Sequence, residues 1–203
     1  HESETAIIVL TDPRPPRPVT IPITLKYTAR PDATGLARVD LRWTPTPGQR
    51  RFRLFYSDEV RLNGYLESVR DDAAHPNNTA AGALLASLTI DPALDQAQRA
   101  QLFKDNAHLL GRTAFEQITA DPLELPPGAA EMQFDHAISG SLEVLSFYRV
   151  VSVSAANVEA SFVGSAVVPV AVPNELPPND PDLSLATVRE MVDSRLLQRS
   201  DAV

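Results

Sequence analysis

The chain has 203 residues, of which 43% are hydrophobic, and its formal net charge is −8 at pH 7. This negative charge argues against nucleic acid or an anionic membrane as a partner, and the lack of cysteine excludes disulfides, thiolate metal ligands and a cysteine nucleophile. No apolar stretch approaches the roughly 20 residues that a membrane-crossing helix needs. The 18 prolines outnumber the 8 glycines and lie mostly in clusters between runs of β-forming residues, which favours an all-β body.

The N-terminal part contains two stretches that are typical of edge strands. The short apolar run Ala6–Leu10 is followed by the proline-rich segment Arg14–Pro18, which we interpret as an extended spacer because proline lacks the amide proton that a sheet interior needs. From Thr20 to Tyr27 apolar and polar residues alternate, which predicts a half-buried strand. Pro22 removes a backbone donor and therefore places this strand at a sheet edge.

Two further strands are predicted on either side of a proline-containing turn. Val39, Leu41 and Trp43 alternate with polar residues, so the only tryptophan is expected to face inward. Phe52–Tyr56 begins the next strand. The basic run Gln49–Arg53 is interpreted as the solvent-facing side of that strand, and not as a binding patch.

Residues 57–140 are interpreted as an insertion into the β-domain. Asp71–Ala83 is rich in small and polar residues and predicts a loop, which the short apolar piece Leu84–Ile90 closes. A helix is predicted over about 91–110, because Asp91-Pro92 is a typical helix start, and we expect its apolar side to pack on the β-structure. Beyond it, residues 113–128 predict a strand followed by a turn, and residues 132–136 predict another short strand.

The longest run rich in β-branched and aromatic residues is Leu142–Ala155, which predicts a central strand. Its expected partners are the strands at 39–43 and 52–56. Tyr148 and Val150 share one face, but the next residues on that face are serines, while valines lie on the opposite face. Either a bulge or burial of both faces explains this pattern, and in the second case the inserted helix is the expected cover.

The C-terminal part is interpreted as a linker and a helix. Residues 173–182 form a proline-rich, semi-rigid linker. Residues 183–203 predict an amphipathic helix that has no domain of its own and therefore needs a partner surface. The apolar residues expected to dock on that partner are Leu185, Val188, Val192 and Leu196. The chain as a whole is interpreted as a piece excised from a longer protein.

Two of these strands resemble a known family. Val39–Pro45, a short turn and Arg51–Tyr56 resemble the second and third strands of a fibronectin type III domain. In that family a buried tryptophan on the second strand packs near an aromatic-rich third strand, and Trp43 with Phe52 and Tyr56 occupy the matching positions. Fold follows from this resemblance, whereas a ligand or reaction does not.

The C-terminal strands extend the resemblance. Phe147–Val150 resembles the sixth strand, in which Tyr148 would be the corner tyrosine whose hydroxyl bonds to the backbone, and Ala166–Val172 would be the last strand. The resemblance implies a mainly β fold, a fibronectin type III-like sandwich over residues 1–172, with the inserted helix and the C-terminal helix added. One turn departs from the family, because Leu145-Ser146-Phe147 stands where a Leu-Pro-Gly-Thr-like sequence is usual. The expected core residues are Trp43, Phe52, Tyr56, Tyr148 and Val150.

No catalytic, cofactor or metal site is predicted. Asp135 beside His136 could orient an imidazole for base catalysis, but the chain has no Gly-x-Ser-x-Gly nucleophile motif. Asp58 and Glu59 are interpreted as a solvated strand end instead of a pair of catalytic carboxylates. Asp71-Asp72 lacks the spacing of a calcium loop, and Asn77-Asn78-Thr79 fits an N-glycosylation acceptor in a secreted eukaryotic protein.

These observations favour a non-catalytic structural or interaction module of a larger bacterial assembly, with a protein or a neighbouring domain as its partner. Two alternatives stay open. One is a carbohydrate-binding module that uses Tyr65 and Phe55 as stacking platforms, and the other is a small hydrolase built on Asp135 and His136. An extracellular or cell-surface location is favoured, and a cytoplasmic assembly stays open.

Overall fold

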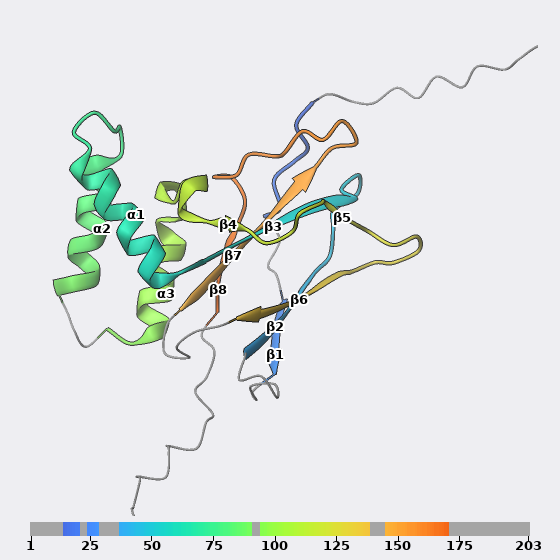
Figure 1. Ribbon diagram of the computed structural model, residues 1–203, viewed down its shortest axis with the longest axis horizontal. Helices are drawn as coiled ribbons and strands as arrows, with labels where there is room; N and C mark the ends of the chain where they lie inside the picture. The colour runs from blue at the N-terminus through green and yellow to red at the C-terminus, as the bar shows by residue number, and fades with distance from the viewer. Residues whose placement is uncertain (1–13, 21–23, 29–36, 91–93, 139–144, 171–203) are drawn as a thin grey trace, which may run out of the picture. The chain divides into compact units, whose positions relative to one another are not determined.

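The computed structural model describes residues 14–20, 24–28, 37–90, 94–138 and 145–170 (Figure 1). The chain divides into two compact units, His1–Pro173 and Asn174–Val203, and all described residues belong to the first. Several predictions lie outside these residues: the strand at 6–10, Pro22, the helix start at 91–92, the linker at 173–182, and the helix at 183–203 with Leu185, Val188, Val192 and Leu196.

Three antiparallel strands form the first sheet, in the order β1-β2-β6. The strands are β1 (Thr24–Thr28), β2 (Ala37–Trp43) and β6 (Met132–Ile138). β1 lies at an edge, as the alternating pattern with its proline predicted. The predicted inward residues of β2, which are Val39, Leu41 and Trp43, are all buried.

The second sheet has the order β4-β3-β7-β8, and β5 also pairs with β3. Its strands are β3 (Arg51–Asp58), β4 (Glu116–Gln117), β5 (Leu123–Glu124), β7 (Ser146–Val153) and β8 (Val167–Val170). The prediction that β7 is a central strand is confirmed, since it pairs with β3 on one side and β8 on the other. The prediction that residues 39–43 are its second neighbour is wrong, because those residues belong to the other sheet.

Both faces of β7 are covered. All eight of its residues are buried, and its ladder with β3 runs from Arg51 opposite Val153 to Asp58 opposite Ser146 without an extra residue. Phe147 belongs to an apolar cluster that includes the helices, whereas Tyr148 belongs to the cluster shared by the two sheets. Of the two explanations for the irregular pattern of β7, burial of both faces is therefore the right one.

The fold is mixed α/β: the expected antiparallel β-structure is present, but it carries more helix than the single inserted helix that was predicted for a mainly β protein. The described residues form three α-helices, α1 (Glu59–Asp71), α2 (Asn78–Ile90) and α3 (Gln96–Asp105), and two 3₁₀ turns, η1 (Ala107–Leu109) and η2 (Arg112–Ala114). The loop predicted at 71–83 overlaps the end of α1 and the beginning of α2. The helix predicted over 91–110 is shorter, because Asp95 caps it and it ends at Asp105.

Each helix has a local reason to form. Asp58, the last residue of β3, accepts a hydrogen bond from the backbone nitrogen of Arg61 and thereby caps α1. The Asp95 carboxylate and the Gln98 side chain form a reciprocal capping box at the start of α3. α2 carries no charged residue, and it gains its stability by packing against α1 through an apolar cluster.

The helices cover one face of the second sheet, beside β3 and β7 in Figure 1. Phe103 of α3 packs edge-on against Phe147 of β7, with ring centroids 4.9 Å apart. Leu62 and Leu66 of α1 belong to the same apolar cluster. The expected cover by an inserted helix is thus supplied by α3 and shared with α1 and α2. None of the helices in the described part of the chain is both long and apolar enough to cross a bilayer.

The other face of the second sheet packs against the first sheet. Trp43 contacts Phe52 edge-on across this core, with ring centroids 5.5 Å apart. Of the expected core residues, Trp43, Phe52, Tyr148 and Val150 are buried, and Tyr56 is half-buried at the margin of the same cluster. The β-structure is therefore two packed antiparallel sheets with a helical layer on one outer side.

Candidate binding groove

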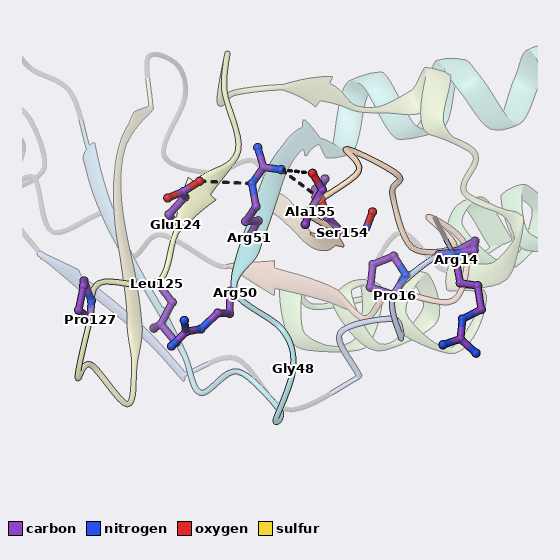
Figure 2. A pocket seen from close by; sticks show the side chains of 12 residues that line it. Arg14, Pro16, Gly48, Arg50, Arg51, Glu124, Leu125, Pro127, Ser154 and Ala155 are labelled. Atoms are coloured by element: carbon purple, nitrogen blue, oxygen red, sulfur yellow. Dashed lines mark hydrogen bonds and ion pairs between the residues drawn. The ribbon is translucent and has the colours of Figure 1, made fainter. Parts of the chain in front are cut away.

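A groove of about 630 Å³ opens where β3 begins and β7 ends (Figure 2). Four separate stretches of the chain line it. They are residues 14–16, residues 48–51 except Gln49, residues 124–127 except Pro126, and residues 153–155. Its volume is within the range of protein sites that bind small molecules or peptide side chains.

The proline-rich segment forms one wall because two polar side chains hold it. The carbonyl oxygen of Arg17 accepts hydrogen bonds from Nε2 of Gln49, at 2.8 Å, and from the hydroxyl of Ser152. Gln49 and Ser152 are themselves buried, so these bonds satisfy side-chain groups that would otherwise lack partners. Residues 14–16 are thereby tied to the ends of the β3–β7 ladder.

The groove floor is organised by Arg51. Its Nη1 donates to the carbonyl oxygens of Ser154 and Ala155, at 3.1 and 3.4 Å, and its Nε lies 3.4 Å from a carboxylate oxygen of Glu124. These three contacts, drawn as dashed lines in Figure 2, connect Ser154 and Ala155, which follow β7, to Glu124 of β5. Arg51 and Glu124 largely neutralise each other, so this arginine has mainly a structural role.

Arg50 is in a different situation. Its backbone oxygen accepts a hydrogen bond from Leu125, at 2.7 Å, but its side chain is exposed and makes no ion pair within the described part of the chain. Figure 2 shows the guanidinium beside Leu125, at the side of the groove opposite Pro16 and Arg14. The described residues that line the groove therefore include three arginines and one glutamate, on a chain whose net charge is −8.

A second hollow of about 380 Å³ adjoins the groove. Gly48, Arg50 and Leu125 line both hollows, so Arg50 lies where the two meet. Gly48 adopts a positive φ of 91°, a backbone conformation that favours glycine, in the turn that lines both hollows. The two hollows therefore share one cationic side chain, that of Arg50.

No family model, no curated protein and no solved structure matches the chain. The functional interpretation therefore depends on the geometry of the groove and of the other polar clusters.

A smaller cleft of about 190 Å³ lies between β6 and the β3–β4 edge, lined by Tyr56, Glu116 and His136 among others. Nδ1 of His136 lies 2.9 Å from the hydroxyl of Tyr148. Burial lowers the pKa of His136, against the opposing effect of Glu116 and Asp135, and burial raises the pKa of Tyr148 far above its ordinary value. The histidine is therefore a neutral partner of a phenol at physiological pH.

The dyad considered for a hydrolase does not form. Asp135 is exposed and pairs with Arg38 of the neighbouring strand, at 2.8 Å, whereas His136 points toward Tyr148 in the core between the sheets. Adjacent strand residues point to opposite faces, which separates the carboxylate from the imidazole. The Tyr148 hydroxyl likewise bonds to a side chain, whereas the resemblance implied a bond to the backbone.

The other acidic candidates have structural roles. Asp58 caps α1, and Glu59 pairs with Arg99 at 2.8 Å, which joins α1 to α3. Asp71 pairs with Arg70, and Asp72 accepts a hydrogen bond from the backbone of Ala74. No group of three or more potential metal ligands is found among the described residues.

The two aromatic platforms considered for carbohydrate stacking are not available as an exposed pair. Phe55 is 1% exposed in the cluster beneath the helices, so its selection as a platform is wrong. Tyr65 is half-buried, and its hydroxyl lies so close to Gly111 that a Cβ built there would be 2.4 Å away. The described residues that line the groove include no aromatic side chain.

Sequence reasoning missed the groove, although two of its features were visible. The proline run at 14–18 was interpreted as a spacer and the basic run at 49–53 as a solvated strand face. Only the tether through Arg17, Gln49 and Ser152 brings the two together. A proline-rich segment beside an arginine pair is the signal that could have indicated the site.

Proposed function

We propose that this chain is a non-catalytic interaction module that works within a larger multidomain or multi-subunit assembly. Its β-structure is proposed to be a fibronectin type III-like sandwich with a helical layer inserted between β3 and β4. The observation that carries the functional proposal is a pair of hollows that share Arg50 as a lining residue, which we propose to be occupied by an extended segment of a protein partner.

The sorting of strands between the sheets supports the fibronectin-like assignment. In immunoglobulin-like sandwiches, strands A, B and E share one sheet while C, F and G share the other. If β1, β2, β3, β6, β7 and β8 are assigned to A, B, C, E, F and G in chain order, the two sheets β1-β2-β6 and β3-β7-β8 are sorted in this way. The contact of Trp43 with Phe52 also agrees with the family's tryptophan on the second strand.

The chemistry of the groove supports binding over turnover. Glu124 is its only carboxylate among the described lining residues, and this group is paired with Arg51. The lining contains no histidine, and the one side-chain hydroxyl, that of Ser154, has no adjacent base. Prolines, Leu125 and Val153 supply apolar surface beside the charged groups, a mixture that is typical of binding sites.

A displayed library of random peptides tests this proposal. The purified chain selects binders, whose affinities are then measured for the wild type, for Ala155→Trp and for Ala83→Trp. Ala155 is exposed at the groove, so the tryptophan would fill it without disturbing the core, whereas Ala83 is exposed on α2 and does not line the groove.

We expect the selected peptides to bind the wild type and Ala83→Trp equally and Ala155→Trp at least about tenfold more weakly, a difference of about 1.4 kcal/mol. If no peptide is selected, or if Ala155→Trp binds as the wild type does, the groove is not the interaction site.

A further inference from the structure

We infer that the groove accepts an extended acidic peptide, with one carboxylate of the peptide paired to Arg50 and apolar residues on either side of it. This inference rests on the proposed function and adds the chemistry of the partner. It is argued from the charge of the groove, from the position of Arg50 and from the nature of the walls.

The charge of the groove is opposite to that of the chain. The protein carries a net charge of −8, yet Arg50 and Arg51 both line this groove, where Glu124 is the only carboxylate among the described lining residues. Glu124 is engaged by Arg51, and the exposed side chain of Arg50 has no carboxylate partner within the described residues. A guanidinium presents paired donors that match a carboxylate in two parallel hydrogen bonds, so Arg50 is suited to an aspartate or glutamate of a partner.

The position of Arg50 defines where the acidic residue would sit. Arg50, Gly48 and Leu125 line both hollows, so a ligand that occupies the two must pass the Arg50 side chain. Val153, Pro16 and Leu125 present apolar surface in the larger hollow, and Pro45 and Ala129 do so in the smaller. The favoured ligand therefore has a carboxylate between two apolar positions.

The walls favour recognition through side chains over addition of a strand. Pro15, Pro16 and Pro127 line the groove and have no amide proton to offer to a ladder. An extended peptide can be recognised through its side chains while its own backbone remains solvated. An extended peptide of a few residues therefore fits the groove better than a β-strand does.

A polyanion is a poorer fit than a sparsely acidic peptide. Nucleic acid and sulfated glycans carry a charge at nearly every unit and need rows of cations, whereas one arginine of the groove is already neutralised by Glu124. The net charge of −8 would also repel a polyanion at long range. A peptide with a single carboxylate is repelled much less than a polyanion while it pairs with Arg50.

The test compares peptide selection by three forms of the chain: wild type, Arg50→Glu and Lys104→Glu. Lys104 is exposed on α3, does not line the groove, and gives the same change in net charge. The strongest wild-type binder is then synthesised with a fluorescent label, together with analogues in which its acidic residue is replaced by glutamine or by lysine. Fluorescence anisotropy gives the dissociation constants, and a heparin octasaccharide and a single-stranded oligonucleotide compete in the same assay.

We expect wild type and Lys104→Glu to select peptides with a shared acidic position, and Arg50→Glu to lose that preference or to select a basic residue there. The glutamine analogue should bind the wild type about tenfold more weakly than the acidic peptide, and it should bind Arg50→Glu and wild type alike. Affinity for the acidic peptide should fall as salt rises.

The two proposals fail in different ways. If selected peptides occupy the groove, as judged by Ala155→Trp, but show no acidic preference or bind Arg50→Glu equally, the acidic partner is overturned while the interaction module stands. If the heparin or oligonucleotide fragment binds more tightly than the best peptide, the partner is a polyanion and the inference is also overturned. If no selected peptide binds more weakly to Ala155→Trp than to the wild type, the proposed function itself is overturned.

Discussion

The hydroxyl of Tyr148 lies 2.9 Å from Nδ1 of His136, so a polar contact joins the two sheets across an otherwise apolar interface. Tyr148 comes from the centre of the second sheet and His136 from the edge of the first. The rings also pack edge-on, with centroids 5.7 Å apart, and Tyr56 contacts both of them. The contacts among Tyr56, His136 and Tyr148 hold β6, an edge strand of the first sheet, against β7 of the second sheet.

Replacing Tyr148 by phenylalanine should destabilise the fold by about 1 kcal/mol, because the imidazole of His136 loses its partner while the ring packing is kept. Urea unfolding measures this change. A double-mutant cycle with His136→Phe should give a coupling free energy of similar size. A coupling close to zero would show that the contact makes no net contribution.

Stability should fall as the pH is lowered below about 6.5. Burial lowers the pKa of His136 from 6.5 in the folded chain, so the unfolded chain binds more protons in this range. The stabilisation that neutral His136 contributes is complete above pH 6.5, and it is lost as the pH falls from 6.5 through the pKa of His136 in the folded chain. The slope should be a fraction of the about 1.4 kcal/mol per pH unit that one full proton gives.

The matched variants for this pH dependence are His136→Gln and His108→Gln, where His108 is an exposed residue of η1. Urea midpoints between pH 5 and pH 8 should vary less for His136→Gln than for the wild type, and His108→Gln shows how much the loss of an exposed histidine alone changes them. An unaltered pH profile of His136→Gln would mean that another group carries the dependence.

Arg149 should be the most sensitive polar residue of the core. Its side chain is completely buried and donates to the carbonyl oxygens of four residues that lie outside its own strand, namely Ala107, Leu110, Phe162 and Ser165. Burial lowers the pKa of Arg149 to about 10, so it stays charged at neutral pH. Arg149→Met would remove a donor from each of these oxygens, of which those of Ala107 and Phe162 keep a backbone donor, and should cost about 3 kcal/mol.

Denaturant unfolding of three variants tests the role of Arg149. Arg149→Lys should be intermediate, because a single ammonium group cannot reach the carbonyls on both sides as the forked guanidinium does. Arg70→Met, at an exposed position on α1, should change stability far less than Arg149→Met does. If Arg149→Met unfolds at the same denaturant concentration as Arg70→Met, the carbonyl network is dispensable.

Glu159 should link the segment that follows β7 to η2. Its carboxylate pairs with Arg53 of β3 and with Arg112 of η2. Burial opposes ionisation of Glu159, but hydrogen bonds from Arg112 and Arg53 outweigh this effect and hold its pKa below the ordinary value of 4.5. Its contribution is therefore present above pH 4.5 and is lost as the pH falls through the folded pKa.

Glu159→Gln should destabilise the protein by about 1–3 kcal/mol at neutral pH, because Arg53 is left partly buried without a counter-charge. The deficit relative to wild type should shrink as the pH is lowered below 4.5. Glu124→Gln, whose side chain is 73% exposed, should change stability by less than about 0.5 kcal/mol in the same urea titration. Equal effects of the two substitutions would contradict the network.

The strands were predictable where one face is buried and side chains alternate. The pattern at Val39, Leu41 and Trp43 placed β2, and the β-branched and aromatic run at 142–155 placed β7. The irregular pattern of β7 also predicted its second cover, since Phe147 and Val151 face the helical layer. Pairing was less predictable, because the choice of neighbour depends on which sheet a strand joins and not on its own sequence.

The helices and the groove could not be predicted for physical reasons. α2 (Asn78–Ile90) has small residues and no charge, so its buried side is not distinguished by polarity, and it was interpreted partly as a loop. α1 starts directly at the last residue of β3, where Asp58 serves both elements. The groove needs contacts such as that between Gln49 and Arg17, which join segments that no local pattern connects.

The β3–β7 ladder also determines when the protein can fold. Phe55 and Arg149 lie opposite each other in this ladder, although all three helices separate them in the sequence. Such non-local pairing slows folding, because a long loop must close before the contacts that stabilise it can form. During synthesis on the ribosome, α1 and α2 can associate early, but β3 lacks its long partner strand until β7 has emerged. Until then the apolar faces of β3 and the helices depend on one another or on chaperones for protection from aggregation.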